Sequence, residues 1–231
     1  RALNDYDGDG YSDVIVGAYQ ADLGEANEGN VFVYAGSPTG VPATPSRTLD
    51  CPGDHAFAWF GVNVGVAGDV DADGYADLVV GSTLYDLGTA DEGAAFLFRG
   101  GPGGLPATPS VTLDNPSGEG NARFGVTVAG AGDVNGDGFA DVLVGAFRED
   151  TTAVDVGRAY LYYGASGGIP ATPSATLDEP TAQGGANFGS WVGTAGDVNG
   201  DGLAGVSISA QARDDPAIDE GSVFVYLGAA T

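Results

Sequence analysis

The sequence predicts an all-β protein assembled from repeated units of four short strands. An Asp-rich loop recurs every 64 residues, and residues 69–132 and 133–196 align without a gap and match at 32 of 64 positions. No segment shows a 3.6-residue apolar period with helix caps, whereas short strand-like runs recur at even spacing. This pattern is typical of the four-stranded blades of a β-propeller.

Four runs in each unit are expected to form strands in a fixed order. The first precedes the Asp-rich loop, at 60–64 and 124–128, and the second follows it, at 13–17, 77–81 and 141–145. The second strands are continuous apolar runs, which favours burial on both faces. The third strands are expected at 31–34, 95–98, 159–162 and 223–226, and the fourth at 47–49, 111–113 and 175–177. Each fourth strand follows a PATPS motif, and this proline-flanked position suits the outer edge of a sheet.

The strand order divides the single propeller region 1–231 into repeats at 1–59, 60–123, 124–187 and 188–231. The first repeat then lacks its first strand and the last lacks its fourth, which gives about three and a half blades. We expect further repeats of the same protein, or neighbouring copies, to complete a larger ring or assembly. Otherwise apolar faces around Val14, Val16, Val223 and Val225 would be exposed to water.

The four Asp-rich loops have the composition of a calcium cage. They read DYDGDGYSD, DVDADGYAD, DVNGDGFAD and DVNGDGLAG. Oxygen side chains at positions 1, 3 and 5, a backbone carbonyl at position 7 and an acid at position 9 suit Ca²⁺. The predicted ligands are Asp5, Asp7, Asp9, Tyr11 and Asp13; Asp69, Asp71, Asp73, Tyr75 and Asp77; Asp133, Asn135, Asp137, Phe139 and Asp141; and Asp197, Asn199, Asp201 and Leu203. Gly205 replaces the last acid, so we expect three strong sites and a weaker fourth.

Charge and composition exclude several function classes. The formal net charge is −25, and four calcium ions, which carry +8, would leave about −17. Such a surface repels nucleic acid and anionic membranes, and no apolar run reaches the length of about 18 residues that a membrane span needs. A chain with one His and one Cys offers neither a His-based triad nor a zinc site, so we do not expect an enzyme. Glycosidase chemistry that uses carboxylates alone stays open.

Phe-Gly pairs stand at 60–61, 124–125 and 188–189, with a calcium-type loop after each, and Gly-Ala follows at 17–18 and 145–146. In the other two repeats Gly-Ser at 81–82 and Ser-Ala at 209–210 replace the Gly-Ala pair. This order of motifs resembles the FG-GAP repeats of the integrin α-subunit propeller, a calcium-binding β-propeller family. Dockerins and thrombospondin-type calcium repeats space their loops differently.

The resemblance implies a calcium-stabilised binding or adhesion module that is extracellular or at the cell surface. In an integrin-like blade the loops opposite the calcium loops are free to bind a ligand. Here these are residues 51–59, 115–123 and 179–187, with 18–30, 82–93, 146–157 and 210–221. We expect a protein or glycan ligand on this face, or neighbouring copies of the chain, and neither nucleic acid nor membrane insertion.

Two alternatives remain. The array could be a calcium-rigidified structural component of a larger surface assembly without its own ligand site, which the near-identical repeats favour. Acids that recur one repeat apart in the loops at 18–30 and 82–93 could form a second metal site. They are Asp22, Glu25 and Glu28, with Asn27 beside them, and Asp86, Asp91 and Glu92.

Overall fold

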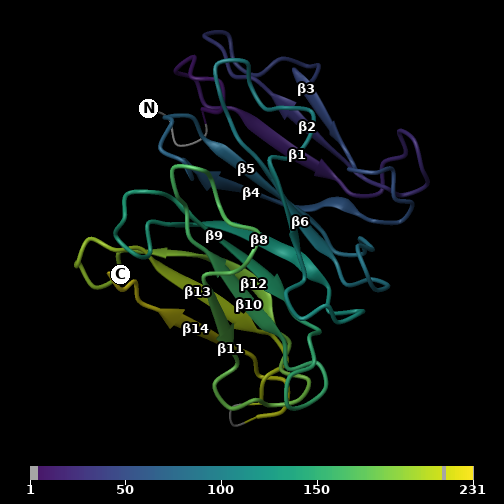
Figure 1. Cartoon of the computed structure of the whole chain (residues 1–231), viewed down its shortest axis with the longest axis vertical. Helices are drawn as coiled ribbons and strands as arrows, with labels where there is room; N and C mark the ends of the chain where they lie inside the picture. Colours follow the sequence, from purple (N-terminus) through teal and green to yellow (C-terminus); the bar gives the residue numbers. More distant parts are fainter. Residues whose placement is uncertain (1–4, 215–216, 231) are drawn as a thin grey trace.

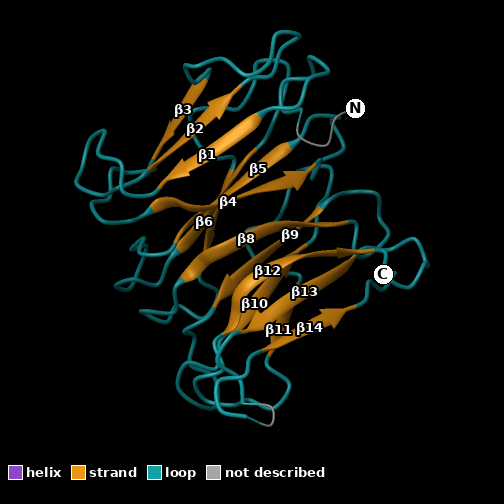
Figure 2. Ribbon diagram, turned by 180° about the vertical axis from the view of Figure 1, so that it is seen from behind, coloured by secondary structure: helices purple, strands orange, loops and turns teal. Residues whose placement is uncertain are grey.

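Four antiparallel β-sheets follow one another along the chain, and the described part of this computed structural model contains no helix (Figures 1 and 2). The structure describes residues 5–214 and 217–230. Residues 1–4 of the predicted first repeat, 215–216 of the predicted loop 210–221, and Thr231 lie outside them. Because no described helix exists, none is long and apolar enough to cross a membrane.

The strands of each sheet fall within one sequence repeat and pair in chain order. Sheet 1 contains β1 (Val14–Ala18), β2 (Asn30–Tyr34) and β3 (Arg47–Asp50). Sheet 2 contains β4 (Phe60–Gly68), β5 (Asp77–Ser82), β6 (Ala94–Phe98) and β7 (Val111–Asp114). Sheet 3 contains β8 (Phe124–Gly132), β9 (Asp141–Ala146), β10 (Arg158–Tyr162) and β11 (Ala175–Asp178). Sheet 4 contains β12 (Phe188–Gly196), β13 (Gly205–Ala210) and β14 (Ser222–Tyr226).

This arrangement confirms the predicted all-β fold, with antiparallel sheets of three or four strands that are consistent with propeller blades. The predicted fourth strands β3, β7 and β11 lie at sheet edges. The first strands β4, β8 and β12 contact one another from sheet to sheet. Consecutive strands run in opposite directions, so the loops gather at the two ends of the strands, as Figure 2 shows. We call the end that carries the Asp-rich loops the Asp-loop face and the other end the opposite face.

The first strands are longer than predicted, since β4 and β8 have nine residues where five were expected. The extension is rich in glycine, which weakens a strand signal in the sequence. Glycine is needed there because the neighbouring sheet passes close by: a Cβ on Gly65 would lie 2.9 Å from the carbonyl oxygen of Val128. The first strands also contain bulges, for example between Phe60 and Asn63.

The hydrophobic core is divided into three clusters, and each lies between two successive sheets. One contains Val31 and Val33 of sheet 1 with Phe60 and Phe96 of sheet 2. Corresponding clusters join sheet 2 to sheet 3 and sheet 3 to sheet 4, with Phe124 and Phe188 in the positions of Phe60. The second strands β5 and β9 are buried along their whole length and contribute side chains to the clusters on both sides. Continuous apolar runs therefore mark the strands that lie between two neighbouring sheets.

Main-chain atoms of neighbouring sheets also meet at a series of glycines, which we call the glycine seam. A Cβ on Gly17, Gly81 or Gly145 would collide with the carbonyl oxygen of Gly61, Gly125 or Gly189, respectively. The second glycine of each pair has a left-handed backbone with φ of 79–84°, a conformation that glycine adopts without strain. The Phe-Gly pairs of the sequence thus place Phe in the core and Gly against the preceding sheet.

Candidate metal centre and the opposite face

The first aspartate of each Asp-rich loop folds the loop around itself. In loop 1, the backbone N–H groups of Gly8 and Gly10 donate to the two carboxylate oxygens of Asp5, at 2.6 and 2.9 Å. Asp133 and Asp197 accept the equivalent pair of bonds, and Asp69 accepts the N–H groups of Asp73 and Gly74. The loops can turn tightly because Gly8, Gly136 and Gly200 have a left-handed backbone, and Ala72 adopts the same conformation in loop 2.

Positions 3 and 5 complete the same turn in all four loops. The position-5 acids Asp9, Asp73, Asp137 and Asp201 accept a hydrogen bond from the backbone N–H of position 7, at 2.8–3.0 Å. Those donors belong to the predicted carbonyl ligands Tyr11, Tyr75, Phe139 and Leu203. In loops 3 and 4 the side-chain amides of Asn135 and Asn199 also donate to the position-5 acid, at 2.8 Å. The bond from position 7 to the position-5 acid is thus common to all four loops.

The position-9 acid joins the loop to the hairpin beyond it. Asp77 accepts the N–H of Val70 at 2.7 Å on one oxygen and the N–H of Gly100 at 2.8 Å on the other. Asp13 and Asp141 make the equivalent pair of bonds. The pKa of Asp77 is raised to about 7, mainly because the carboxyl group is buried. The two hydrogen bonds oppose this rise, whereas the negative charges of Asp71 and Asp73 increase it. Gly205 offers no such bond in the fourth loop.

Three carboxylates converge in each of the first two loops. Ligand atoms of Asp5, Asp7 and Asp13 lie within 4.8 Å of one another, and so do those of Asp69, Asp71 and Asp77. Crowded carboxylates repel one another unless a cation or protons neutralise them, and an all-oxygen set fits Ca²⁺. Asp9 and Asp73 do not belong to these triads. The residues therefore fit a calcium ion, while coordination by the full predicted ligand set stays a prediction.

An arginine beside the second triad was not foreseen from the sequence. Arg99 donates from Nη1 to Oδ2 of Asp71 at 2.8 Å. The equivalent positions of the other repeats hold Ala35, Tyr163 and Leu227, so this ion pair belongs to repeat 2 alone. The pair comes from segments 28 residues apart, which is why inspection of the loop motif does not reveal it.

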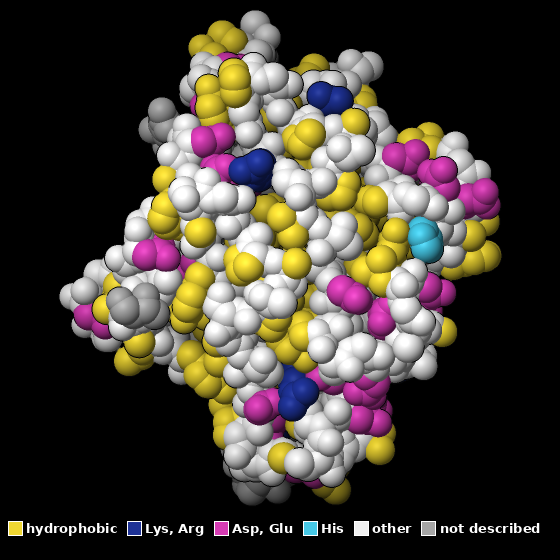
Figure 3. Space-filling view, viewed as in Figure 1, with side chains coloured by type: hydrophobic (Ala, Val, Ile, Leu, Met, Phe, Trp, Pro, Cys, Tyr) yellow, Lys and Arg dark blue, Asp and Glu magenta, His cyan; other side chains and the backbone are white. Residues whose placement is uncertain are grey.

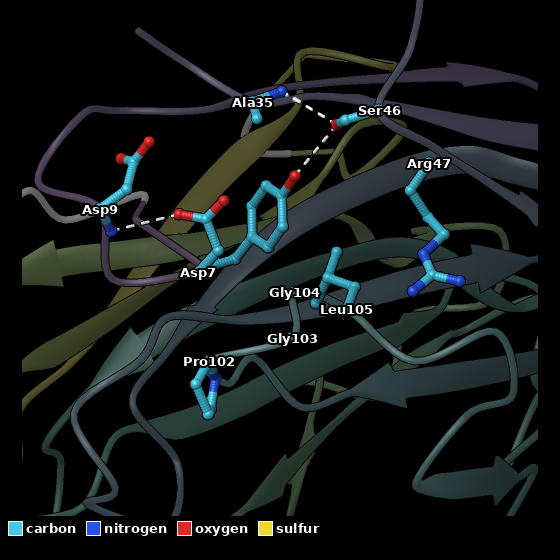
Figure 4. Close-up of a pocket in the computed structure, with 10 residues that line it drawn as sticks. Asp7, Asp9, Ala35, Ser46, Arg47, Pro102, Gly103, Gly104 and Leu105 are labelled. Atoms are coloured by element: carbon cyan, nitrogen blue, oxygen red, sulfur yellow. Dashed lines mark hydrogen bonds between the residues drawn. The ribbon is translucent and has the colours of Figure 1, made fainter.

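A cleft of about 510 Å³ lies beside the first loop on the Asp-loop face (Figure 4). Asp7 and Asp9 stand at one side of it, Arg47 at another, and the turn that contains Leu105 at a third (Figure 4). The Tyr6 hydroxyl and Ser46 Oγ lie 3.1 Å apart in its wall. The cleft thus belongs to the surroundings of the first candidate metal site.

On the opposite face, the acids considered for a second metal site brace their own loops. Glu28 is buried and accepts the N–H of Leu23 at 3.0 Å, and buried Glu92 accepts that of Leu87 at 2.7 Å. Asp22 and Asp86 each accept a backbone N–H five residues ahead. Within residues 5–214 and 217–230, these acids form no group of three convergent carboxylates. The structure therefore gives them a role in loop folding.

The single cysteine and the single histidine lie together near the opposite face. Cys51 is buried, and burial raises the pKa of its thiol to about 12. His55 packs its ring on Tyr85 with centroids 4.2 Å apart. A neutral, buried thiol is a poor nucleophile. These contacts give both residues a packing role.

Ion pairs on the opposite face also differ from repeat to repeat. Arg158 bonds Glu149 at 2.8 Å and Asp178 at 2.6 Å, and the Tyr160 hydroxyl donates to Glu149. Between sheets 3 and 4, Arg213 bonds buried Glu179 at 2.9 Å. Trp59 lies edge-on to Tyr19 with ring centroids 5.4 Å apart, whereas Trp191 is largely exposed, so the packing between sheets expected of the two tryptophans is not seen for Trp191.

Comparison with known proteins identifies the repeat. The family model described as FG-GAP repeat matches residues 2–34, 60–98 and 124–162. Integrin alpha-5 of Xenopus laevis is 34% identical over 172 residues, which cover 71% of this chain and 16% of that protein. Human integrin alpha-IIb is 34% identical over 158 residues, covering 66% of this chain and 15% of that protein. Integrin alpha-4 of Xenopus laevis is 32% identical over 179 residues, 76% of this chain and 17% of that protein. The match therefore spans less than a fifth of each relative.

Proposed function

Because the chain carries FG-GAP repeats and is homologous to integrin α subunits, we propose that it is a calcium-stabilised binding module that works at a cell surface or outside the cell. The FG-GAP family binds calcium and is generally non-enzymatic, and integrin α homologues are cell-surface proteins. Millimolar calcium outside the cell is the concentration that loops of this kind need.

Calcium would be held by the Asp-rich loops and would neutralise their charge. The triads Asp5, Asp7 and Asp13, and Asp69, Asp71 and Asp77, are the residues best placed to hold it. The loops that begin at Asp133 and Asp197 share their hydrogen bonding and would bind two further ions, the last more weakly because of Gly205. Ions at these positions would fix the Asp-loop face and stabilise the folded state by mass action.

The opposite face supports a binding role, because its side chains differ between repeats while those that stack the sheets do not. Phe60, Phe124 and Phe188 occupy one repeated position and are all buried. The residues just before them are Trp59, Arg123 and Asn187. Variable loops on a rigid scaffold are the usual location of recognition sites. A protein or glycan ligand on this face is the partner that we propose.

The second candidate function is a structural one, in which the chain is a calcium-rigidified part of a larger surface assembly. It is favoured by the match at 32 of 64 positions between repeats, since similar units form a regular spacer. Val14, Val16, Val223 and Val225 are 42, 45, 69 and 54% exposed on the outer sheets. In this alternative they would contact neighbouring repeats or neighbouring copies.

A binding screen separates the two functions. The calcium-loaded chain is applied to arrays of glycans and of extracellular-matrix proteins, and the screen is repeated after chelation with EDTA. We expect saturable binding that calcium supports and EDTA removes. A chain that melts at a higher temperature with calcium, yet binds nothing on either array, would favour the structural alternative.

A further inference from the structure

A pocket of about 280 Å³ lies on the opposite face between sheets 2 and 3. Sheet 2 and its loops contribute Trp59, Val62 and Leu84 to its wall, and sheet 3 and its loops contribute Arg123, Phe147 and Arg148. The wall is mainly apolar, with two guanidinium groups in it. No metal-loop residue lines this pocket, so it is separate from the candidate calcium sites.

Arg123 has an incomplete set of hydrogen-bond partners. Its Nη2 lies 3.4 Å from a carboxylate oxygen of Asp91, while its Nη1 is buried and has no acceptor. A buried donor without an acceptor costs free energy, and such groups are rare in folded proteins. Arg123 can therefore gain from a further acceptor.

Arg148 brings a second positive charge to the same place. Its side chain is exposed, and its guanidinium carbon lies 5.5 Å from the ring centroid of Phe147. Burial lowers the pKa of Arg123, Asp91 opposes that shift, and the charge of Arg148 adds to it. The two arginines are thus close enough to interact, and Asp91 is the one carboxylate with a recorded ion pair to either of them among the described residues.

The charge of this pocket stands out against the rest of the chain. The sequence contains seven Lys and Arg residues and 32 Asp and Glu residues. Figure 3 shows that basic side chains are few and widely separated on the face it displays. This pocket brings two of the seven arginines together, with one ion-paired acid beside them.

The pocket residues are also those that the repeats do not share. Arg123 corresponds to Trp59 and Asn187 in other repeats. Phe147 corresponds to Tyr19, Thr83 and Gln211, and Arg148 corresponds to Gln20, Leu84 and Ala212. Stacking of the sheets cannot require these side chains, since each sheet stacks with a different set. The pocket is therefore specific to the junction of sheets 2 and 3.

Two of these residues keep an unfavourable backbone conformation. Trp59 and Arg123 have φ of 58° and 61°, in the left-handed region, where the equivalent Asn187 has 55°. Asn tolerates this region better than bulky side chains do. Strain of this kind is concentrated at functional sites, where side-chain placement outweighs its cost.

We propose that this pocket binds an acidic side chain and an adjacent apolar side chain that a protein partner presents. The proposal deepens the binding function above and rests on it. The carboxylate would bond Arg148 in the two-pronged geometry that guanidinium groups favour and would be attracted by the charge of Arg123, while the apolar side chain packs on Trp59 and Leu84. The volume lies just below the usual range for free small ligands, about 300–1,000 Å³, and suits an anchor that projects from a larger surface. Trp and Arg are the residues most enriched at such anchoring points.

The test uses the calcium-loaded, ¹⁵N-labelled chain and two isosteric probes. These are N-acetyl-phenylalanyl-glutamate amide and N-acetyl-phenylalanyl-glutamine amide, titrated at 150 mM salt. We expect the glutamate probe to shift the Trp59 indole and the Arg123 and Arg148 side-chain N–H signals saturably. The Trp191 indole signal should not move. The glutamine probe should bind about tenfold more weakly, because it lacks the charge that strengthens these hydrogen bonds.

Two matched arginine variants test whether the glutamate probe binds in this pocket. Arg148→Gln should reduce the affinity for the glutamate probe to that for the glutamine probe. Arg47→Gln makes the same charge change on the Asp-loop face and should leave the affinity unchanged. Melting with and without calcium checks that both variants fold.

Several results would overturn the proposal. These are equal affinities for the two probes, no saturable shift with either, or equal effects of the two substitutions. Equally tight binding of free acetate would assign the pocket to small anions, and shifts that appear on concentrating the chain alone would assign it to a second copy. Failure of the titration with a normal rise in melting temperature on calcium loading would reject this pocket and leave the calcium-stabilised module intact.

Discussion

A single methyl group at Gly81 tests how the sheets are joined. In Gly81→Ala the new Cβ would collide with the carbonyl oxygen of Gly125 in the next sheet and would lie 3.5 Å from Cγ1 of Val128. The carbonyl oxygen is part of the main chain, so it cannot rotate away as a flexible side chain could. One of the two sheets must shift, and the core between sheets 2 and 3 shifts with it.

The cost follows from overpacking. Extra methyl groups in a packed core typically cost about 1–3 kcal/mol, and the rigid obstacle places this case toward the upper end. Replacing Gly by Ala also stiffens the unfolded chain, which returns about 0.4–1 kcal/mol. The net loss is about 2 kcal/mol, which corresponds to a fall of roughly 4–8 °C in melting temperature for a chain of this size.

The assay is thermal and urea unfolding of the calcium-loaded chain, followed by circular dichroism. Gly101→Ala is the matched control, because a Cβ there would have no neighbour within 4 Å and Gly101 has no left-handed backbone. We expect this control to be neutral or slightly stabilised. Equal melting temperatures for the two variants would refute the inference that main-chain contact at the seam limits the packing.

Three further predictions concern the metal loops and the buried polar groups. Asp73→Asn removes the negative charge of a predicted calcium ligand and should reduce the rise in melting temperature that calcium produces, whereas Asp54→Asn, outside the motif, should retain the full rise; equal responses in a calcium titration would count against the ligand assignment. Burial tends to raise the pKa of Glu179, but hydrogen bonds from Gln183, Thr181 and Arg213 outweigh burial and lower this pKa. The stabilisation that ionised Glu179 gives the folded chain is therefore present at neutral pH and is lost as the pH falls through the folded-state pKa. The gap in urea midpoint between the wild type and Glu179→Gln should therefore persist from pH 7 to about 5 and narrow below about pH 4; a gap that widens in acid would contradict this. Cys51 should resist a thiol reagent at pH 8 in the folded chain and react with one equivalent in urea, and rapid labelling without urea would show that the thiol is not buried as described.

The sequence predicts the strands and the loops well because both depend on local patterns. The apolar run at 77–81 predicts a strand buried on both faces, and β5 is fully buried. The double role of Asp77 could not be predicted in the same way, since one of its two N–H donors, Gly100, lies 23 residues further along the chain. The loop motif identifies Asp77 as a possible ligand, but only the fold shows that it also ties the loop to a hairpin.

The opposite face was predicted only as a set of loops. Arg123 and Arg148 are each unremarkable in the sequence, and they lie on one pocket wall because β8 and β9 are neighbours in a sheet. The other side of the pocket comes from Trp59 and Leu84, which are distant from Arg148 in the sequence, so no local pattern records the junction. Comparing equivalent positions of the four repeats is the sequence signal that could have directed attention to this junction.

The glycine seam has a consequence for how such arrays change over generations. Two blades meet there through atoms that every amino acid possesses, so the junction between Gly81 and Gly125 carries no side-chain code that one blade must match in the next. At this contact a duplicated 64-residue unit needs no matched side chain in its neighbour, provided that both units keep their glycines. Blade number and loop sequence are left free to diverge independently, which lets one architecture acquire new surfaces without rebuilding its interior.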